Sequence, residues 1–202
     1  MASIYQLKPA FQGRLRPLVR RLAVAGVTAN QVTIGALLLS IVAGFLIAAA
    51  PDAKLPLLLL PIALFIRMAL NAIDGMLARE HGQSTRLGAL LNEIGDVLSD
   101  AALYLPLALV PSVPAWPIVI AVVLAVIAEF SGVLGAVAGG QRRYDGPMGK
   151  SDRAFAFGVL AFSLGLGLPA DPWIDGCLWL VVALLTVTVW NRARGVLRDV
   201  PQ

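Results

Sequence analysis

Residues 71–96 read NAIDGMLAREHGQSTRLGALLNEIGD and place polar side chains at helical intervals within a very apolar chain. Two sets of residues recur every three or four positions: Arg67, Asn71, Asp74 and Ala78, then Gly88, Asn92, Asp96 and Asp100. Residues at this spacing share one face of an α-helix. A short turn around residues 81–84 separates the two sets, so we expect two antiparallel helices whose polar faces meet.

The remainder of the chain indicates that these helices lie in a membrane. Of 202 residues, 58% are hydrophobic and only 14% are charged, against about 25% charged in soluble domains. Apolar runs occupy residues 31–50, 55–73, 87–110, 115–139, 154–169 and 173–190, most of them near the roughly 20 residues that span a bilayer. We predict an all-α integral membrane protein with six transmembrane helices, forming a single domain over 1–202 with the bundle at about 28–192.

The segment before the first apolar run has a different pattern. Residues 3–22 repeat apolar side chains every three or four positions, with Lys and Arg on the other faces. This pattern favours an amphipathic helix on the cytoplasmic membrane surface, which Pro9 and Pro17 are expected to break or begin. An irregular basic arm is the alternative. Thr28 or Asn30 is expected to cap the first transmembrane helix.

Basic residues are distributed unevenly between the two sides of this topology. Fourteen of the 16 Lys and Arg residues lie before the first span, between the second and third, between the fourth and fifth, or after the sixth. The turns on the other side, at 51–54, 111–114 and 170–173, contain only Lys54. The positive-inside rule then predicts cytoplasmic N and C termini, in what we expect to be a bacterial inner membrane. The basic residues are not interleaved with aromatics, which argues against nucleic acid as a partner and for anionic membrane lipid.

The polar stripes favour a binding or catalytic site over mere helix pairing. A charged group inside a membrane span costs about 2.5–3.5 kcal/mol on insertion scales. Carboxylate and amide oxygens without sulfur ligands suit Mg²⁺ or Mn²⁺, and such a cation would offset the cost of burial. The small residues Gly75, Ala78 and Gly88 would leave a groove, at whose mouth Arg79 could bind a phosphate. Interhelical hydrogen bonding alone is the competing interpretation.

The spacing of the motif resembles that of a known family. CDP-alcohol phosphotransferases, also called CDP-alcohol phosphatidyltransferases, carry the signature Asp, two residues, Asp-Gly, two residues, Ala-Arg, eight residues, Gly, three residues, Asp, three residues, Asp. Six of its eight defined positions match here, namely Asp74, Gly75, Ala78, Arg79, Gly88 and Asp96. Asn71 and Asn92 replace the first and third Asp.

The resemblance implies an enzyme of phospholipid synthesis. Family members transfer a substituted phosphate from a CDP-linked donor, often CDP-diacylglycerol, to an alcohol and release CMP. By resemblance, Asp74, Asn71, Asn92 and Asp96 would form the site of one or two Mg²⁺ or Mn²⁺ ions, and with Gly75, Ala78, Arg79 and Gly88 the donor nucleotide site. Asp96 would be the catalytic base, the active site would be cytoplasmic, and the chain would form a homodimer.

The two Asn residues change the charge of such a site. Four carboxylates balance two divalent ions, whereas Asp74 and Asp96 balance one. One hypothesis is a single tightly held ion, with a second arriving only with substrate phosphates. Asp100 or Glu93 could instead replace the missing carboxylates. Arg67 could take part of the role of a metal, although a structural pair between Arg67 and Glu129 is the favoured interpretation.

The loop before the fifth span contributes a further basic cluster. Residues 146–153, GPMGKSDR, resemble a Gly-Lys segment of the family. Arg142, Arg143, Lys150 and Arg153 would form a pocket for a phosphorylated acceptor such as glycerol phosphate or inositol phosphate. Ordinary positive-inside charge is the alternative.

Two other functions remain open from the sequence. Asn71 and Asn92 favour a protein that binds CDP-lipid, or a partner subunit, that has kept the groove and lost turnover. A small transporter is less favoured, because its site would be expected at broken helices near the membrane midplane.

Overall fold

The structure is a computed structural model that describes residues 4–111, 113–169 and 173–199. Within these residues the chain is helical. The elements in order are α1 (Ile4–Val24), α2 (Ala29–Ala49), α3 (Lys54–Glu80), α4 (Arg86–Tyr104), the 3₁₀ helix η1 (Leu105–Leu109), α5 (Ala115–Val137), α6 (Lys150–Gly165) and α7 (Trp173–Asp199).

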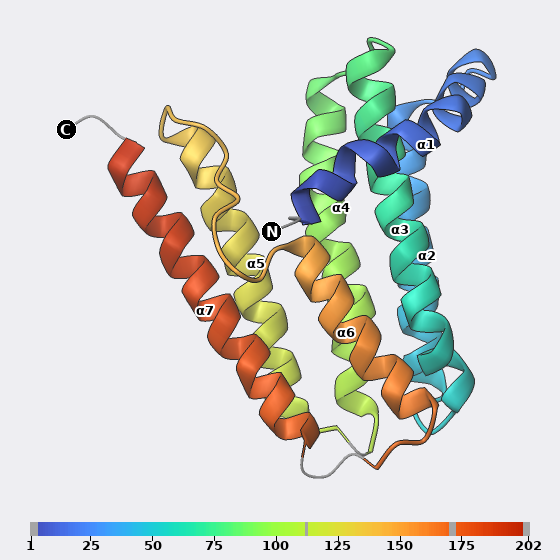
Figure 1. Cartoon of the computed structure of the whole chain (residues 1–202), viewed down its shortest axis with the longest axis vertical. Helices are drawn as coiled ribbons and strands as arrows, with labels where there is room; N and C mark the ends of the chain where they lie inside the picture. The colour runs from blue at the N-terminus through green and yellow to red at the C-terminus, as the bar shows by residue number, and fades with distance from the viewer. Residues whose placement is uncertain (1–3, 112, 170–172, 200–202) are drawn as a thin grey trace.

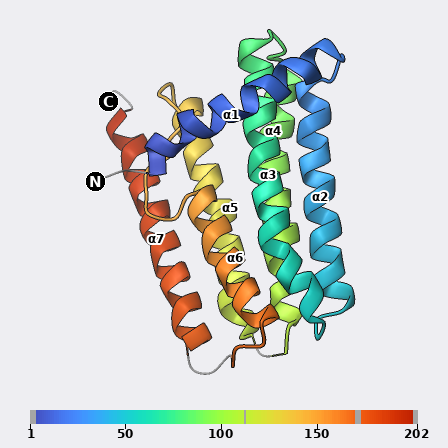
Figure 2. The same cartoon turned by 45° about the vertical axis from the view of Figure 1, so that its right-hand side comes forward.

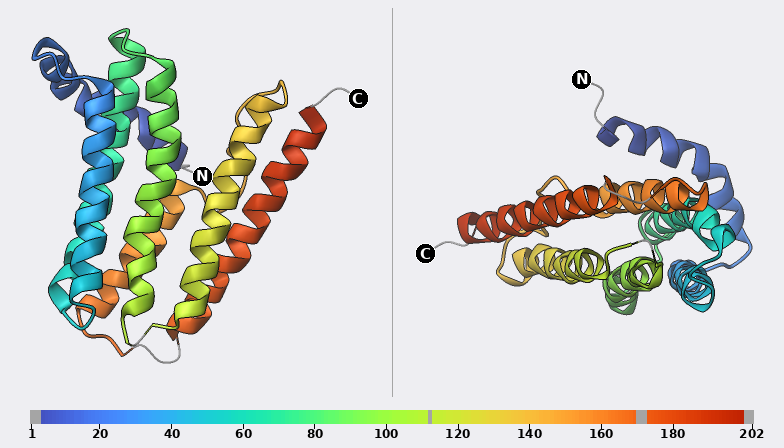
Figure 3. Two further views of the ribbon diagram at one scale, coloured as in Figure 1. Left: turned by 180° about the vertical axis from the view of Figure 1, so that it is seen from behind. Right: turned by 90° about the horizontal axis from the view of Figure 1, so that it is seen from below.

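Helices α2 to α7 run along one common direction, and α1 lies across them at one end (Figures 1 and 2). Viewed along the bundle, α3, α6 and α7 form one row and α2, α4 and α5 a second (Figure 3). Helix α2 packs against both α3 and α4, α6 packs against α3, and α5 packs against α7. The turn after α3, the loop after α5 and the C-terminal end of α7 lie at the same end as α1 (Figure 1).

Each of the six predicted apolar runs corresponds to a helix. Four of these helices, α2, α3, α5 and α7, are long and apolar enough to cross a membrane. Helix α4 carries Arg86, Glu93, Asp96 and Asp100, and α6 has only 16 residues. Membrane crossing by α4 and α6 therefore stays a prediction.

Local signals explain where several helices begin and end. Thr28, not Asn30, caps α2: its side chain accepts a hydrogen bond from the Gln31 amide at 3.2 Å, and the Gln31 side chain accepts one from the Thr28 amide at 2.9 Å. This reciprocal pair is a capping box. Pro106 lies at the start of η1, where its missing N–H ends the α-helical hydrogen bonding of α4.

Helix α1 is continuous through Pro9 and Pro17, so the expectation that these residues break or begin it was wrong. The alternative of an irregular arm is likewise excluded for the described residues, although residue 3 of the predicted segment lies outside them. Two contacts fix α1 to α3. The Phe11 and Phe65 rings meet edge to face at 6.1 Å, and Arg16 pairs with Glu80 at 2.9 Å.

The loop between α5 and α6 folds back along the bundle, so α6 begins partway down it (Figure 1). The Arg143 amide donates to the carbonyl of Gly132 at 3.0 Å, and a Cβ at Gly132 would lie only 2.7 Å from the Arg143 oxygen. Glycine thus allows the loop to touch α5. This path shortens α6 and brings Lys150 and Arg153 to the level of the α4 carboxylates.

Candidate active site

A cavity of about 860 Å³ lies between α3 and α4 at the end crossed by α1. The predicted residues that line it are Arg67, Asn71, Asp74, Gly75, Ala78, Arg79, Gly88, Asn92, Glu93, Asp96, Arg142 and Lys150. The two polar stripes therefore face each other, as their spacing predicts. Three other predicted site residues, all of them described in the structure, are not part of the lining: Asp100, Arg143 and Arg153.

A residue of α2 holds the Asp74 side chain, which lies on α3, by a hydrogen bond. The Thr33 hydroxyl donates to Asp74 Oδ2 at 2.8 Å, and Asp74 is almost fully buried. In the described part of the chain no ion pair reaches this carboxylate. Thr33 was not among the predicted site residues, because a threonine on an apolar helix gives no signal of which neighbouring helix it faces.

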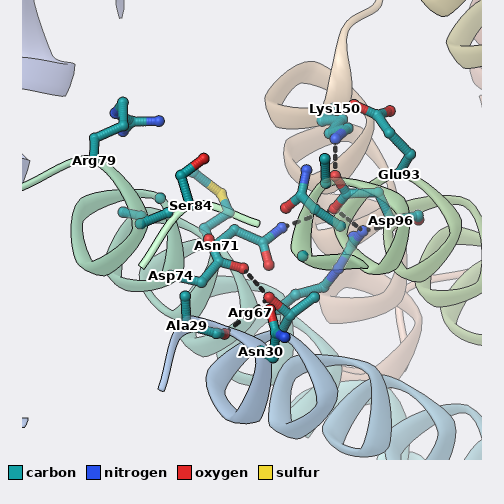
Figure 4. A pocket seen from close by; sticks show the side chains of 18 of the residues that line it. Ala29, Asn30, Arg67, Asn71, Asp74, Arg79, Ser84, Glu93, Asp96 and Lys150 are labelled. Atoms are coloured by element: carbon teal, nitrogen blue, oxygen red, sulfur yellow. Dashed lines mark hydrogen bonds and ion pairs between the residues drawn. The ribbon is translucent and has the colours of Figure 1, made fainter. Parts of the chain in front are cut away.

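Asp96 is contacted by the chain itself at both carboxylate oxygens (Figure 4). Asn71 Nδ2 donates to Oδ1 at 3.0 Å, and the Lys150 ammonium pairs with Oδ2. Arg67 Nη2 lies 3.4 Å from Oδ1 and donates to the Asp96 backbone oxygen at 3.1 Å. Two positive charges and one amide thus surround this buried carboxylate.

The favoured pairing of Arg67 with Glu129 was wrong. Arg67 Nη1 instead donates to Asp100 Oδ1 at 2.6 Å. Glu129 lies on α5, where it receives Arg153 at 2.9 Å, Arg142 at 3.0 Å and Arg192 at 3.5 Å. Helix α3 directs Arg67 toward α4, whereas the partners of Glu129 come from the folded loop, from α6 and from α7.

Asp100 does not replace a missing cavity ligand. It is 4% exposed, and its second oxygen accepts from Arg153 Nε at 2.9 Å and Nη2 at 2.7 Å. Arg153 is fully buried between Asp100 and Glu129, and it also donates to the carbonyl of Met148. These groups form an ionic layer behind the cavity. Glu93 does line the cavity, but it pairs with Arg142.

Small residues position polar groups around the cavity. A Cβ at Gly75 would lie 3.0 Å from the Arg79 guanidinium, so glycine lets Arg79 fold close to α3. A Cβ at Gly88 would lie 2.7 Å from Asn30 Oδ1, so glycine also admits the Asn30 side chain between α2 and α4. Arg79 and Lys150 lie on opposite sides of Asn71 and Asp74 (Figure 4).

The turn between α3 and α4 is tied to the start of α2 by a residue that the sequence did not single out. Gln83 Oε1 accepts from the Ala29 amide at 2.6 Å, and Gln83 Nε2 donates to the Val27 carbonyl at 3.3 Å. The C-terminal end of α3 and the N-terminal ends of α2 and α4 are thereby held together at the mouth of the cavity.

The cavity combines polar and apolar walls. Its charged lining comprises three acidic side chains, Asp74, Glu93 and Asp96, and four basic ones, Arg67, Arg79, Arg142 and Lys150. Phe11 of α1 and Phe65 and Met68 of α3 form an apolar part of the lining. Such a lining suits a ligand that has an anionic head and an apolar portion.

The oxygen ligands fit one hard divalent cation better than two. Asp74 offers a carboxylate without an ion-pair partner, and the amide oxygens of Asn71 and Asn92 belong to the same cavity. Both Asp96 oxygens are already contacted by cations or N–H groups. Within the described residues no group of three or more His, Cys, Asp or Glu side chains could hold a metal.

Comparisons with known proteins agree with this architecture. A model of the CDP-alcohol phosphatidyltransferase family matches residues 26–190. The inner membrane protein YnbA of Escherichia coli (strain K12) is 47% identical over 196 residues, which is 96% of each chain. Archaetidylinositol phosphate synthase of Pyrococcus horikoshii is 31% identical over 104 residues, 52% of this chain and 53% of that protein.

Solved structures of Mycobacterium tuberculosis phosphatidylinositol phosphate synthase share the fold. The structure with CDP-DAG bound has a TM-score of 0.74 at 22% identity, covering 89% of this chain and 92% of that one. The complex with manganese and citrate has a TM-score of 0.75 at 21% identity, covering 90% and 88%. The resemblance inferred from residues 71–96 is thus confirmed, and the chain is an integral membrane protein that belongs to the CDP-alcohol phosphatidyltransferase family.

Proposed function

We propose that this protein transfers a phosphatidyl group from CDP-diacylglycerol to an alcohol and releases CMP. The observation that carries the proposal is the cavity between α3 and α4, which brings Asp74, Arg79 and Asp96 together beside the apolar side chains of Phe11 and Phe65. A CDP-linked lipid has this combination of an anionic diphosphate and apolar chains. The mycobacterial structure with CDP-DAG bound supports the choice of donor.

Each side chain has a role in this proposal. Arg79 binds a phosphate oxygen of the donor, and Gly75 and Gly88 keep the cavity wide enough for the nucleotide. Asp74, with the amide oxygens of Asn71 and Asn92, would hold a Mg²⁺ or Mn²⁺ ion. When bound, this ion would neutralise charge on the diphosphate.

The transfer itself uses Asp96. The acceptor oxygen forms a bond to the phosphorus of the phosphatidyl group, and the bond from that phosphorus to the bridging oxygen breaks. CMP leaves with the electron pair, and the hydroxyl proton passes to the Asp96 carboxylate. Arg67 and Asn71 hold Asp96 in place for this step.

The membrane arrangement is part of the proposal. Six spans, α2 to α7, cross a bacterial inner membrane, α1 lies on its cytoplasmic surface, and both termini and the cavity face the cytoplasm. The basic segments support this orientation, since the loops that carry them lie at one end of the bundle (Figure 1). We further propose that the protein is a single-domain chain that forms a homodimer, which light scattering of the detergent-solubilised protein tests.

Release of CMP is the decisive experiment. Purified protein is mixed with CDP-diacylglycerol, Mg²⁺ or Mn²⁺, and a panel of free and phosphorylated alcohols. We expect release with at least one acceptor, and its loss in Asp96→Asn. Asp52→Asn, an exposed change in the turn between α2 and α3, is the matched control. If no acceptor supports release and Asp96→Asn equals the unaltered protein, the proposal is wrong.

A second candidate function is favoured by Asn71 and Asn92. These amides remove two negative charges from the cavity, which suits a protein that binds CDP-lipid, alone or as a partner subunit, without turnover. This candidate predicts saturable binding of CDP-diacylglycerol but no CMP release. The double variant Asn71→Asp with Asn92→Asp would then gain activity.

A further inference from the structure

The position of Asn71 relative to Asp96 shows what the loss of one motif carboxylate does. Asn71 Nδ2 lies 3.0 Å from Asp96 Oδ1, so the amide N–H stabilises the carboxylate. An aspartate at position 71 would bring two carboxylate oxygens to about the same distance, which is strongly repulsive unless a cation lies between them. Asn71 therefore removes the need for a cation at this contact.

Two basic side chains supply the positive charge at Asp96 instead. Lys150 reaches Asp96 Oδ2 from the start of α6, and Arg67 reaches Oδ1 from α3. The side chains of Arg67 and Asp96 are both almost fully buried. The Lys150 side chain is about one third exposed and also lines the cavity. A buried carboxylate needs a counter-charge, and here the chain provides it.

Asp74 differs from Asp96 in this respect. Its described polar partners, the Thr33 hydroxyl and the Gly75 backbone N–H, are both neutral, and the motif amides Asn71 and Asn92 line the same cavity. Within the described residues the chain therefore supplies two cations in contact with Asp96 and none in contact with Asp74.

From these contacts we infer that Lys150 and Arg67 take the place of a second divalent cation, and that each chain binds a single divalent ion, at Asp74. The inference rests on the proposed function for the role of the ion. In this site the Lys150 ammonium, rather than a metal, offsets negative charge that substrate brings to the Asp96 side of the cavity.

Counting bound Mn²⁺ tests the inference without turnover. Purified protein in detergent is dialysed against Mn²⁺, with and without CDP-diacylglycerol, and bound ions are counted by elemental analysis and electron paramagnetic resonance. We expect one Mn²⁺ per chain in both conditions and no signal from coupled ion pairs. Two ions per chain, a coupled pair, or no bound ion at all would each overturn the inference.

Variants of the protein test the predicted number of bound Mn²⁺ ions further. Replacing Asn71 and Asn92 by Asp together with Lys150→Gln restores the carboxylates and removes the internal cation, so binding should double to two Mn²⁺ per chain. Lys54→Gln, at the opposite end of the bundle, should leave one. A triple variant that folds but still binds one ion would contradict the inference.

The two proposals fail separately. Absence of CMP release in every condition would overturn the proposed transferase while leaving an ion count of one intact. Conversely, a count of two in an active protein would retain the transferase and remove the role assigned to Lys150 and Arg67.

Discussion

Arg153 binds Asp100 through two nitrogens, with Nε at 2.9 Å and Nη2 at 2.7 Å from the same carboxylate oxygen. Both residues are almost fully buried. The pair links α4 to α6, and Nη2 continues the contact to Glu129 on α5 at 2.9 Å. This ionic layer holds the first turn of α6, which carries both Arg153 and Lys150, against α4 and α5.

The first prediction concerns this layer. Asp100→Asn should destabilise the folded protein by about 3–5 kcal/mol, because it leaves Arg67 and Arg153 buried with an incomplete counter-charge. Thermal unfolding in detergent measures the loss. Arg16→Gln breaks the exposed pair with Glu80 and is the control, which should unfold at nearly the unaltered temperature. Equal unfolding temperatures for both variants would contradict the role of the layer.

The second prediction concerns helix packing at Gly44. A Cβ at this position would overlap the carbonyl oxygen of Ala102, so Gly44→Ala must separate α2 from α4. We expect a loss of about 1–3 kcal/mol in the free energy of unfolding, the range typical of overpacking. Gly35→Ala on the same helix meets no atom within 4 Å and should be neutral or slightly stabilising. Denaturant unfolding curves of the two variants measure the difference, and equal curves would contradict the prediction.

The third prediction concerns the support of Asp74. Thr33→Val keeps the shape of the side chain but removes the 2.8 Å hydrogen bond to Asp74. Loss of such an orienting partner typically weakens metal binding about 10- to 100-fold, and a Mn²⁺ titration followed by electron paramagnetic resonance measures it. Thr186→Val, whose hydroxyl donates to the Val182 carbonyl of its own helix, is the matched control. An unchanged affinity in Thr33→Val would place the ion away from Asp74.

The fourth prediction concerns recognition of the donor. Arg79→Gln should raise the KM for CDP-diacylglycerol about 10- to 100-fold, the effect of losing one hydrogen bond from a charged group. Arg86→Gln removes a positive charge from the nearby start of α4 without touching the cavity lining, so it should leave KM nearly unchanged. An equal rise in both variants would indicate a general effect of surface charge instead.

Much of the fold was predictable from local patterns. The apolar runs located all six bundle helices, although α3 extends to Glu80, beyond the predicted end at residue 73, because its last turns carry the polar motif. The predicted run at 87–110 is divided into α4 and η1, since Pro106 interrupts α-helical hydrogen bonding. The facing stripes of Asn71 and Asp96 also followed from spacing alone.

The partners of the buried charges were not predictable in this way. The sequence grouped Arg142, Arg143, Lys150 and Arg153 into one basic pocket, but Lys150 and Arg142 line the cavity while Arg153 is enclosed behind it. Arg143 pairs with Asp145 in the loop. Helical periodicity predicts on which face of its helix a residue lies. It does not predict how far along the bundle a loop places the start of the next helix.

The sequence by itself determined the helices, the motif frame and the family, because hydrophobic periodicity and motif spacing are properties of neighbouring residues. Only the tertiary structure decided that Lys150 and Arg67 contact Asp96, and that Glu129 receives three arginines. The physical reason lies in the loop after α5, which packs on Gly132 and carries the start of α6 into the bundle. That path depends on contacts between residues far apart in the chain, which no local pattern specifies.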